Sequence, residues 1–195
     1  IGVVNNPFVN MADPEVQQLT DMAIQKFIQA GAIVEEIRIT TDLDMLIDAH
    51  GIIMAVEAAS VHQDKFKHHR GDYGAKITRL LDKGISTRGV DYADALRSVE
   101  RFKQDMRKAI NGFDALLTPT TTSPAPRDLT TTGDPIFQTP WTTCGFPATS
   151  IPSGLSRSGV PVGIQLVSAP FREETLLATA HWCEKVLNIN LAAPV

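Results

Sequence analysis

The sequence predicts an α/β fold, and three observations support this prediction. The first 39 residues have the pattern of a strand, a helix and a second strand. Residues 42–113 show helical periodicity almost throughout, and short apolar runs bounded by Pro and Gly return beyond Asp114. A strand–helix–strand unit pairs its strands in parallel through a right-handed crossover. We therefore expect one sheet with helices packed against it.

The first unit opens on the apolar run IGVV, a buried-strand pattern with no residue before it. Such a start suggests a piece of a longer polypeptide. A loop over residues 5–12 leads to a helix in which Asp13 suits the N-cap and Pro14 the first helical position. Apolar residues recur at helical spacing until Gly31, which should end the helix. Residues 32–39 then alternate as the second strand.

The middle of the chain predicts three helices. The first spans residues 42–69 with an interruption at Gly51. The second is shorter and should stop at Gly84, because glycine is common just beyond the end of a helix. The third begins at Asp91 and carries an apolar stripe at helical spacing. That stripe is typical of a helix face that packs into a core.

The last third of the chain returns to strands. The stretch FDALLTPTTTSPAP at residues 113–126 joins a short strand to a loop rich in threonine and proline. Residues 148–154 predict another strand that ends in a Pro-Ser-Gly turn, and residues 162–167 predict a buried one. A final helix is expected over residues 173–186. The Thr/Pro loop follows directly after a strand, so we expect it to border a site.

The composition is that of an ordinary globular protein, with 195 residues, 43% hydrophobic and 21% charged. A net charge of −4 gives no electrostatic case for binding nucleic acid or an anionic membrane. The basic cluster at residues 65–70 is flanked by Asp64 and Asp72, which favours a solvated helix end. No uninterrupted apolar run reaches about 18 residues, so we expect no membrane span. Without a signal-peptide pattern, the expected location is the cytoplasm.

The familiar catalytic motifs for nucleotides, zinc and serine nucleophiles are missing from the sequence. The five histidines have no metal-ligand spacing, and we expect neither a metal nor a cofactor. Cys144 could be a nucleophile, but no His or Lys lies in the twenty residues before it, so a small packed residue is the preferred interpretation. Ser153, Ser156 and Ser158 fit a reverse turn better than a hydrolase centre, since no lysine is local.

A series of short motifs in fixed order resembles the C-terminal half of the amidase signature family. Each motif alone is weak, whereas the ordered series is specific and covers essentially the whole chain. Glu173 and Glu174 follow the series at the start of the final helix. The series consists of Asp114, Pro119-Thr120, Gly145-Phe146-Pro147-Ala148, Pro152-Ser153-Gly154 and Gly159-Val160-Pro161-Val162-Gly163-Ile164-Gln165.

The resemblance implies a fold, a reaction and a missing part. The fold is the C-terminal lobe of the amidase signature fold, a mixed sheet covered by helices, and the whole chain, residues 1–195, would be one such lobe. The reaction is hydrolysis of an amide C–N bond by a Ser–cis-Ser–Lys triad. Those catalytic residues belong to a Gly/Ser-rich stretch of the other half of the family's fold, and no such stretch occurs here. The resemblance therefore implies no catalytic residue in this chain, which alone should be inactive.

The resemblance also implies which residues contact the substrate. Arg79 falls near an arginine with which the amidotransferases of this family bind the substrate carboxylate, although Thr78 stands where those enzymes carry a second arginine. A solvent-exposed structural arginine is the alternative. Asp134 lies one residue out of register from an acid that the same amidotransferases use on the substrate amine. The remaining candidates line the pocket beside the scissile amide: Thr120, Trp141, Thr142 and Gly145.

Two functional hypotheses follow. In the first, the chain supplies sheet and pocket walls to an amidase whose partners are a small-molecule amide and the missing N-terminal half. In the second, the chain is a non-catalytic truncated fragment that binds ligands or forms homo-oligomers, because a lobe cut from its sheet exposes apolar surface. An independent thiol enzyme built on Cys144 is a third idea. The sequence does not fix the acyl group or the leaving amine.

Overall fold

A computed structural model of the protein describes residues 1–5, 9–39 and 42–189. The loop expected at residues 5–12 therefore includes three residues, 6–8, that lie outside the described part. Its last residues form the short 3-10 helix η1, Val9–Met11. The chain divides into two compact units. Unit 1 comprises Ile1–Thr40 with Asp105–Val195, and unit 2 comprises Thr41–Gln104.

Unit 1 is built on a five-stranded mixed sheet with the order β2-β1-β3-β5-β4. The first three strands run parallel, and β5 runs antiparallel to both of its neighbours. The predicted α/β class and mixed sheet are thus confirmed. The strand expected over residues 32–39 is shorter in the structure, where it covers only residues 35–37. Ile33 precedes it and is 79% exposed, so this apolar side chain does not belong to the buried face of the sheet. The strands are β1 Gly2–Val4, β2 Glu35–Ile37, β3 Leu116–Pro119, β4 Ala148–Leu155 and β5 Pro161–Val167.

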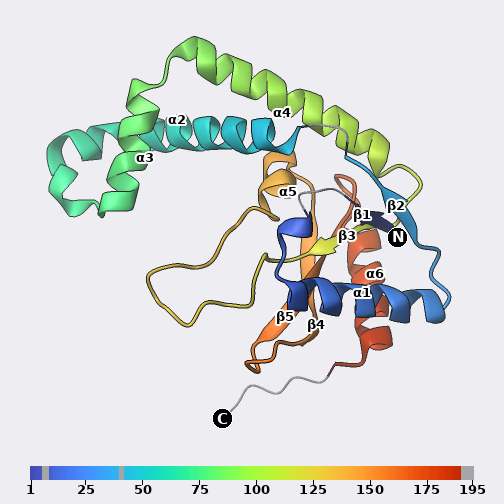
Figure 1. Ribbon diagram of the computed structural model, residues 1–195. Coiled ribbons are helices and arrows are strands. Elements are labelled where there is room, and N and C mark those ends of the chain that lie inside the picture. The colour runs from blue at the N-terminus through green and yellow to red at the C-terminus, as the bar shows by residue number, and fades with distance from the viewer. Residues whose placement is uncertain (6–8, 40–41, 190–195) are drawn as a thin grey trace. The chain divides into compact units, whose positions relative to one another are not determined.

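Helices α1, Pro14–Gln29, and α6, Glu173–Leu187, lie side by side on one face of the sheet (Figure 1). Their buried side chains meet those of β3, β4 and β5 in one apolar core, in which Phe27 and Ile164 are fully buried. Both helices match the predicted ranges closely. Asp13 does take the N-cap position of α1, but its side chain makes no capping hydrogen bond. The core fixes the faces and the register of the strands that lead to the Thr/Pro loop.

Two features of unit 1 differ from the prediction. The segment before β4 contains a six-residue helix, α5, Thr139–Cys144, which ends at Gly145 in the left-handed conformation with φ 66°. Pro152 to Gly154 do not form a turn; they stay in β4, where the register shifts at a bulge. The turn comes later, where the Ser156 N–H donates to the Val160 carbonyl at 2.8 Å. A bulge lets a strand accommodate proline without breaking the rest of its ladder.

Unit 2 is helical, as the sequence predicts. It contains α2, Leu43–His69, the 3-10 helix η2, Arg70–Asp72, α3, Ala75–Ser86, and most of α4, Gly89–Ala109. The two predicted glycine breaks are wrong. Helix α2 continues through Gly51, and α3 continues through Gly84. Gly84 is buried against α2, where a Cβ on it would lie 2.0 Å from the Ala55 carbonyl oxygen.

Among the described residues, one helix is long and apolar enough to cross a membrane by length and composition alone: residues Leu43–Asp72, which contain an 18-residue window with a mean hydropathy of 1.2. The prediction of no membrane span considered only uninterrupted apolar runs. In this helix alanine, isoleucine and methionine raise the mean hydropathy even though polar residues interrupt them. The helix packs against α3 through the small residues Ala55, Ala59 and Gly84. Core helices of soluble proteins meet the same two criteria, so length and composition alone are weak evidence for a membrane span.

Candidate substrate pocket

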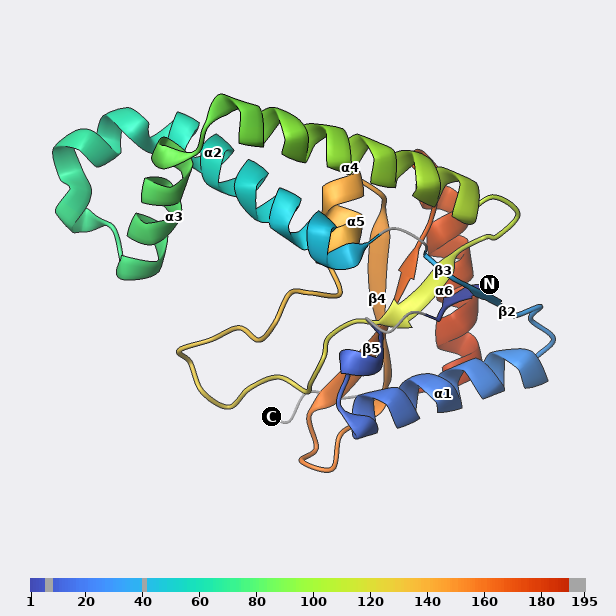
Figure 2. The same ribbon diagram turned by 45° about the horizontal axis from the view of Figure 1, so that its top comes forward.

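The candidate site lies where β3 ends. Its last residue, Pro119, leads into the Thr/Pro loop, which runs out beyond the sheet before the chain returns to α5 (Figure 2). In open α/β sheets, ligands bind outside the carboxyl ends of the parallel strands. The loop predicted to border a site therefore starts at the end of the sheet where ligands bind in this class of fold.

A pocket of about 350 Å³ occupies this position. The loop forms one wall, and the facing ends of β4 and β5 form the other. The pocket includes the predicted residues Thr120 and Asp134. Its lining is almost entirely hydroxyl, glycine and proline: Thr120, Thr121, Thr122, Ser123, Pro124, Ala125, Pro126, Thr132, Gly133, Asp134, Ser150, Ile151, Pro152, Pro161, Val162 and Gly163.

A pair of hydroxyls forms the base of the pocket. Thr120 Oγ1 and Ser150 Oγ share a hydrogen bond of 2.7 Å, and the Thr120 N–H donates to the Gly163 carbonyl at 3.1 Å. Ser150 faces the pocket because β4 pairs antiparallel with β5 in a register that sets it opposite Gln165. The sequence analysis did not identify Ser150 as a site residue. The alternation of side chains along the strand at residues 148–154 could have indicated it.

Gly163 leaves room for these hydroxyls. A Cβ at this position would lie 2.8 Å from Ser150 Oγ and 3.1 Å from Thr120 Oγ1. Real Cβ atoms essentially never approach other heavy atoms within 3.0 Å, so a side chain here would displace the Ser150 hydroxyl. The glycine thus serves a close approach between strand and loop. It belongs to the Gly-x-Pro-x-Gly-x-Gln motif, whose physical role the sequence alone does not reveal.

Two glutamine side chains form hydrogen bonds at the start and at the end of the Thr/Pro loop. Gln138 Nε2 donates to the Thr120 carbonyl. Gln165 is buried in β5, and its Nε2 donates to Thr118 Oγ1 and to the Phe137 carbonyl, each at 3.2 Å. A buried amide with its hydrogen bonds satisfied holds its partners in one arrangement. The two glutamines therefore position the start and the end of the loop that carries the pocket lining.

Asp134 is the charged residue of this pocket. It is exposed, and its Oδ1 accepts a hydrogen bond from the Ile136 N–H at 3.0 Å. Its other oxygen can accept a hydrogen bond from an N–H of a ligand. The lining contains no lysine, histidine or cysteine, and its one carboxylate, Asp134, accepts its hydrogen bond from the Ile136 N–H and not from the Thr120–Ser150 hydroxyls. Chemically the pocket can hydrogen-bond an amide, and its hydroxyl pair has no lysine of the kind that activates a serine nucleophile.

The other predicted residues lie outside this pocket. Thr142 and Gly145 are exposed on α5 and at its C-terminal end, whereas Trp141 is only 2% exposed. The Trp141 indole N–H is buried and has no hydrogen-bond partner in the described part of the chain. Arg79 is exposed on α3 of unit 2, and none of the ion pairs formed among the described residues includes it. The structure thus brings Thr120 and Asp134 together in one pocket and places the other four elsewhere.

Neither cysteine has the surroundings of a reactive thiol. Cys144 is buried in α5, as expected of a small packed residue, and Cys183 is buried in α6. Burial raises the pKa of the Cys183 thiol to about 12, because the apolar core disfavours the thiolate. Within the described residues, no group of three or more His, Cys, Asp or Glu side chains could hold a metal ion.

Comparison with known proteins identifies the family. The family model described as Amidase matches residues 1–177. The chain belongs to the amidase family. This amidase chain is 30% identical to the A subunit of glutamyl-tRNA(Gln) amidotransferase from Geotalea daltonii over an alignment of 218 residues, which covers 95% of the chain and 44% of that relative. The same amidotransferase component from Pseudomonas putida strain W619 is 28% identical, with 100% of the chain and 46% of the relative covered.

Solved structures agree with this assignment. A crystal structure of an amidase superposes with a TM-score of 0.86 at 25% identity and covers 94% of the chain and 44% of its own length. A bacterial aryl acylamidase of the amidase signature family superposes at 0.77 with 19% identity, covering 100% and 46%, and shows the same fold. The suspected family is confirmed. The amidase chain spans somewhat less than half of the length of each of these proteins.

Proposed function

We propose that this chain forms part of an amidase that cleaves a carbon–nitrogen amide bond through a Ser–cis-Ser–Lys mechanism. In this proposal the chain supplies sheet and substrate-pocket walls, and the triad comes from the part of the enzyme that the chain does not span. The observation that carries the proposal is the pocket after β3. It combines hydrogen-bonding groups at Thr120, Ser150 and Asp134 with a lining that contains no lysine, histidine or cysteine.

The division of labour follows from the chemistry. In the triad, lysine takes a proton from the bridging serine, which takes the proton of the nucleophilic serine as that oxygen attacks the amide carbon. The tetrahedral intermediate expels the amine, which leaves with the transferred proton, and water then hydrolyses the acyl-serine. Every bond is made and broken by groups outside this chain. What the chain contributes is orientation, since a substrate held in the reactive geometry lowers the entropic barrier.

The residues of the pocket have proposed roles, and so do the predicted residues that lie outside it. Asp134 accepts a hydrogen bond from the N–H of the leaving amine or amide, while Thr120 and Ser150 hydrogen-bond its polar atoms. By the family resemblance, Trp141, Thr142 and Gly145, in and just after α5, would border the amide, although they do not line this pocket. A role for Arg79 in binding a substrate carboxylate rests on the same resemblance, and Arg79 lies in unit 2. The relatives named as amidotransferase components support a substrate that carries both an amide and a carboxylate, and that specificity is part of the proposal.

A matched pair of aspartates tests the pocket. This chain would replace the corresponding segment in the Geotalea daltonii relative, and release of ammonia from primary amides would be measured. Asp134→Asn should raise KM by about 10-fold, because it removes a charge-assisted hydrogen bond to the substrate. Asp128→Asn changes an exposed aspartate of the same loop that only contacts Thr130 and does not line the pocket. Equal kinetics for the two variants would remove Asp134 from the site.

The second candidate function is a binding or oligomerising module without catalysis. It is favoured by a pocket lining without lysine, histidine or cysteine and by exposed apolar side chains such as Leu129 and Phe171, which are 102% and 94% exposed. Light scattering on the purified chain would decide this point. Stable oligomers of the chain, together with no amide hydrolysis in a complete enzyme that contains it, would favour the module. Amide hydrolysis by that complete enzyme would favour the amidase.

A further inference from the structure

A second pocket of unit 1 lies at the opposite end of β3 from the candidate substrate pocket. Strands β3 and β5 are antiparallel, and the pairing of Leu116 with Val167 brings the segment before β3 and the segment after β5 to the same end of the sheet. The first segment follows α4, and the second leads into α6. Between them lies a pocket of about 360 Å³ whose polar lining residues are Arg107, Asn111, Asp114, Ser168, Arg172 and Thr175.

Two arginines line this pocket from different elements. Arg107 belongs to the last turn of α4, and Arg172 is the N-cap residue of α6. Among the described residues, Arg107 forms neither an ion pair nor a side-chain hydrogen bond, and Arg172 donates only its Nε–H, to Thr175 Oγ1 at 3.1 Å. Because a guanidinium carries five N–H donors, the two side chains keep most of their donors for a ligand or for water.

A buried serine holds the backbone that carries Arg172. Ser168 is 1% exposed, and its hydroxyl donates to the carbonyls of Ala169 and Arg172 at 3.3 and 3.2 Å. The Arg172 N–H in turn donates to the Ala169 carbonyl at 3.2 Å. A buried hydroxyl with its hydrogen bonds satisfied favours one arrangement of its partners. The start of α6, which bears Arg172 and Thr175, is therefore fixed relative to the end of β5.

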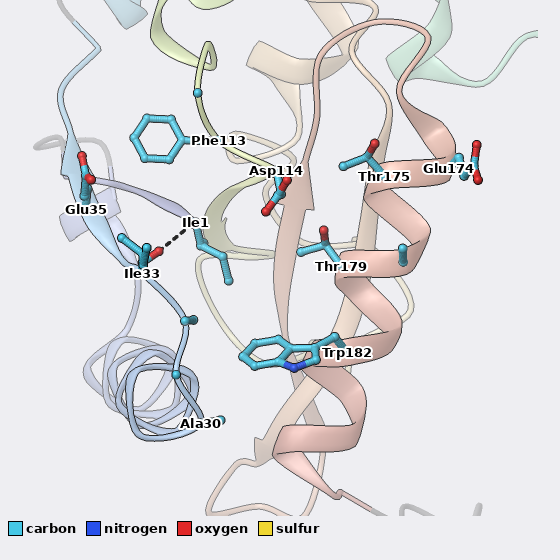
Figure 3. A pocket seen from close by; sticks show the side chains of 14 residues that line it. Ile1, Ala30, Ile33, Glu35, Phe113, Asp114, Glu174, Thr175, Thr179 and Trp182 are labelled. Carbon is cyan, nitrogen blue, oxygen red and sulfur yellow. Dashed lines mark hydrogen bonds between the residues drawn. The ribbon is translucent and has the colours of Figure 1, made fainter.

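One carboxylate shares the pocket with the arginines. Asp114 lines it just before β3, and no ion pair or hydrogen bond joins its side chain to another described residue. Figure 3 looks into the adjoining groove, which shares Asp114 and Thr175 with this pocket, and shows the Asp114 carboxylate between Ile1 and the Thr175 hydroxyl. Glu173 and Glu174 do not line the pocket, so its lining carries two positive charges and one negative charge.

Arginines beside a carboxylate select a particular kind of anion. Guanidinium N–H groups bind the oxygens of phosphate and of sulfate alike. A carboxylate accepts hydrogen bonds, and it repels an anion that brings no proton. Hydrogen phosphate has a P–O–H group that can donate to a carboxylate, whereas sulfate has no such proton. The volume leaves room for the anion and several waters, since each water takes about 30 Å³.

We propose that this pocket binds hydrogen phosphate, with Arg107 and Arg172 donating to its oxygens and Asp114 accepting the hydrogen bond of its P–O–H group. The Asn111 amide and the Thr175 hydroxyl contact the remaining oxygens directly or through water. Both arginines are exposed, so screening by solvent limits the affinity to a Kd of about 1 mM. The proposal goes beyond the amidase function and does not rest on catalysis.

An NMR titration of the chain tests the selectivity. Sodium phosphate, sodium sulfate or methyl phosphate is added at constant ionic strength and about pH 8, and the shift of the Thr175 amide signal gives each Kd. Phosphate should bind about 10-fold more tightly than sulfate, the factor that one hydrogen bond to a charged group provides. Methyl phosphate has lost its last proton at this pH, so it should bind as weakly as sulfate, and this arm separates free phosphate from a phosphate ester. Equal affinity for phosphate and either of the other two anions would overturn the proposal.

Four variants locate the site. Arg107→Gln and Arg172→Gln should each weaken phosphate binding by about 10-fold, whereas Arg157→Gln, at an exposed arginine in the β4–β5 turn outside the pocket, should not change it. Asp114→Asn should tighten sulfate binding and bring the two affinities together, because a neutral amide does not repel sulfate. These side chains are exposed, so the far-UV circular dichroism of each variant should match that of the parent chain.

Two results with these variants would contradict the proposed site. One is phosphate binding that the two pocket arginine variants leave as strong as Arg157→Gln does. The other is a preference for phosphate over sulfate that survives in Asp114→Asn. Neither readout requires enzymatic activity, so failure here is distinguishable from failure of the amidase proposal.

Discussion

Two glycines in unit 2 give opposite predictions for the same substitution. Gly51 lies inside α2, where a Cβ would make an ordinary van der Waals contact with the flexible Lys83 Nζ at 3.7 Å. Gly84 lies inside α3, and a Cβ there would be 2.0 Å from the Ala55 carbonyl oxygen and 2.5 Å from its carbonyl carbon. Both positions gain helix propensity from alanine, about 1 kcal/mol each. Only Gly84 meets backbone that has no flexible end to move.

Gly84→Ala would force α2 and α3 apart. Ordinary van der Waals contact begins near 3.4 Å, so the helices must separate by more than about 1 Å and lose packing around Ala59 and Leu81. Overpacking of this kind costs about 1–3 kcal/mol, which exceeds the gain in propensity. We therefore expect Gly51→Ala to stabilise unit 2 by up to about 1 kcal/mol and Gly84→Ala to destabilise it by up to about 2 kcal/mol.

Urea unfolding followed by far-UV circular dichroism measures both variants against the parent chain, with the midpoint compared at constant m-value. The two substitutions are identical in chemistry and both lie within helices, so the difference between them reports chiefly the contacts of Gly84 with Ala55 and Ala59. If Gly84→Ala proved as stable as Gly51→Ala, the close packing of α2 on α3 would be wrong.

Three further predictions concern single groups. Gly163→Ala should weaken substrate binding in the complete enzyme, measured as a raised KM, because its Cβ displaces the Ser150 hydroxyl; an unchanged KM would show that the hydroxyl pair does not contact the substrate. Burial raises the pKa of the Cys183 thiol to about 12, so iodoacetamide should label it in urea but not in the native chain at about pH 8. The Arg70 guanidinium lowers the pKa of Asp82 through a hydrogen bond. The stability from this pair is therefore present above the unfolded pKa of about 3.9 and lost as the pH falls towards the lower folded pKa. Acid unfolding of Asp82→Asn should lack that loss.

The sequence was sufficient for much of the fold because periodicity and caps act locally. The helix from Pro14 and the strands that end near Pro119 and Val167 follow from apolar spacing and from the residues that bound it. The local sequence did not reveal that Gly51 and Gly84 lie inside helices and do not end them. A glycine has one local preference, to end a helix, and the tertiary contact with Ala55 overrides it at Gly84.

In the candidate site, too, local patterns predicted some residues and tertiary contacts determine the others. The Thr/Pro loop was evident from its composition, and Thr120 and Asp134 do line a pocket beside the end of β3. Ser150 and Gly163 join them through the antiparallel pairing of β4 with β5, and although the alternation along residues 148–154 could have indicated the face of Ser150, the pairing itself is a long-range fact. Arg79 belongs to a separate compact unit, and its role stays a prediction.

The location of the nucleophile tests the central claim most directly. A serine-reactive fluorophosphonate would be added to the complete enzyme that contains this chain, and the modified residue would be located by mass spectrometry of its peptides. The account predicts a single label on a serine outside residues 1–195, and no label on Thr120, Ser150 or any other residue of this chain. A phosphonylated residue within this chain would contradict it, because the pocket would then hold a nucleophile of its own.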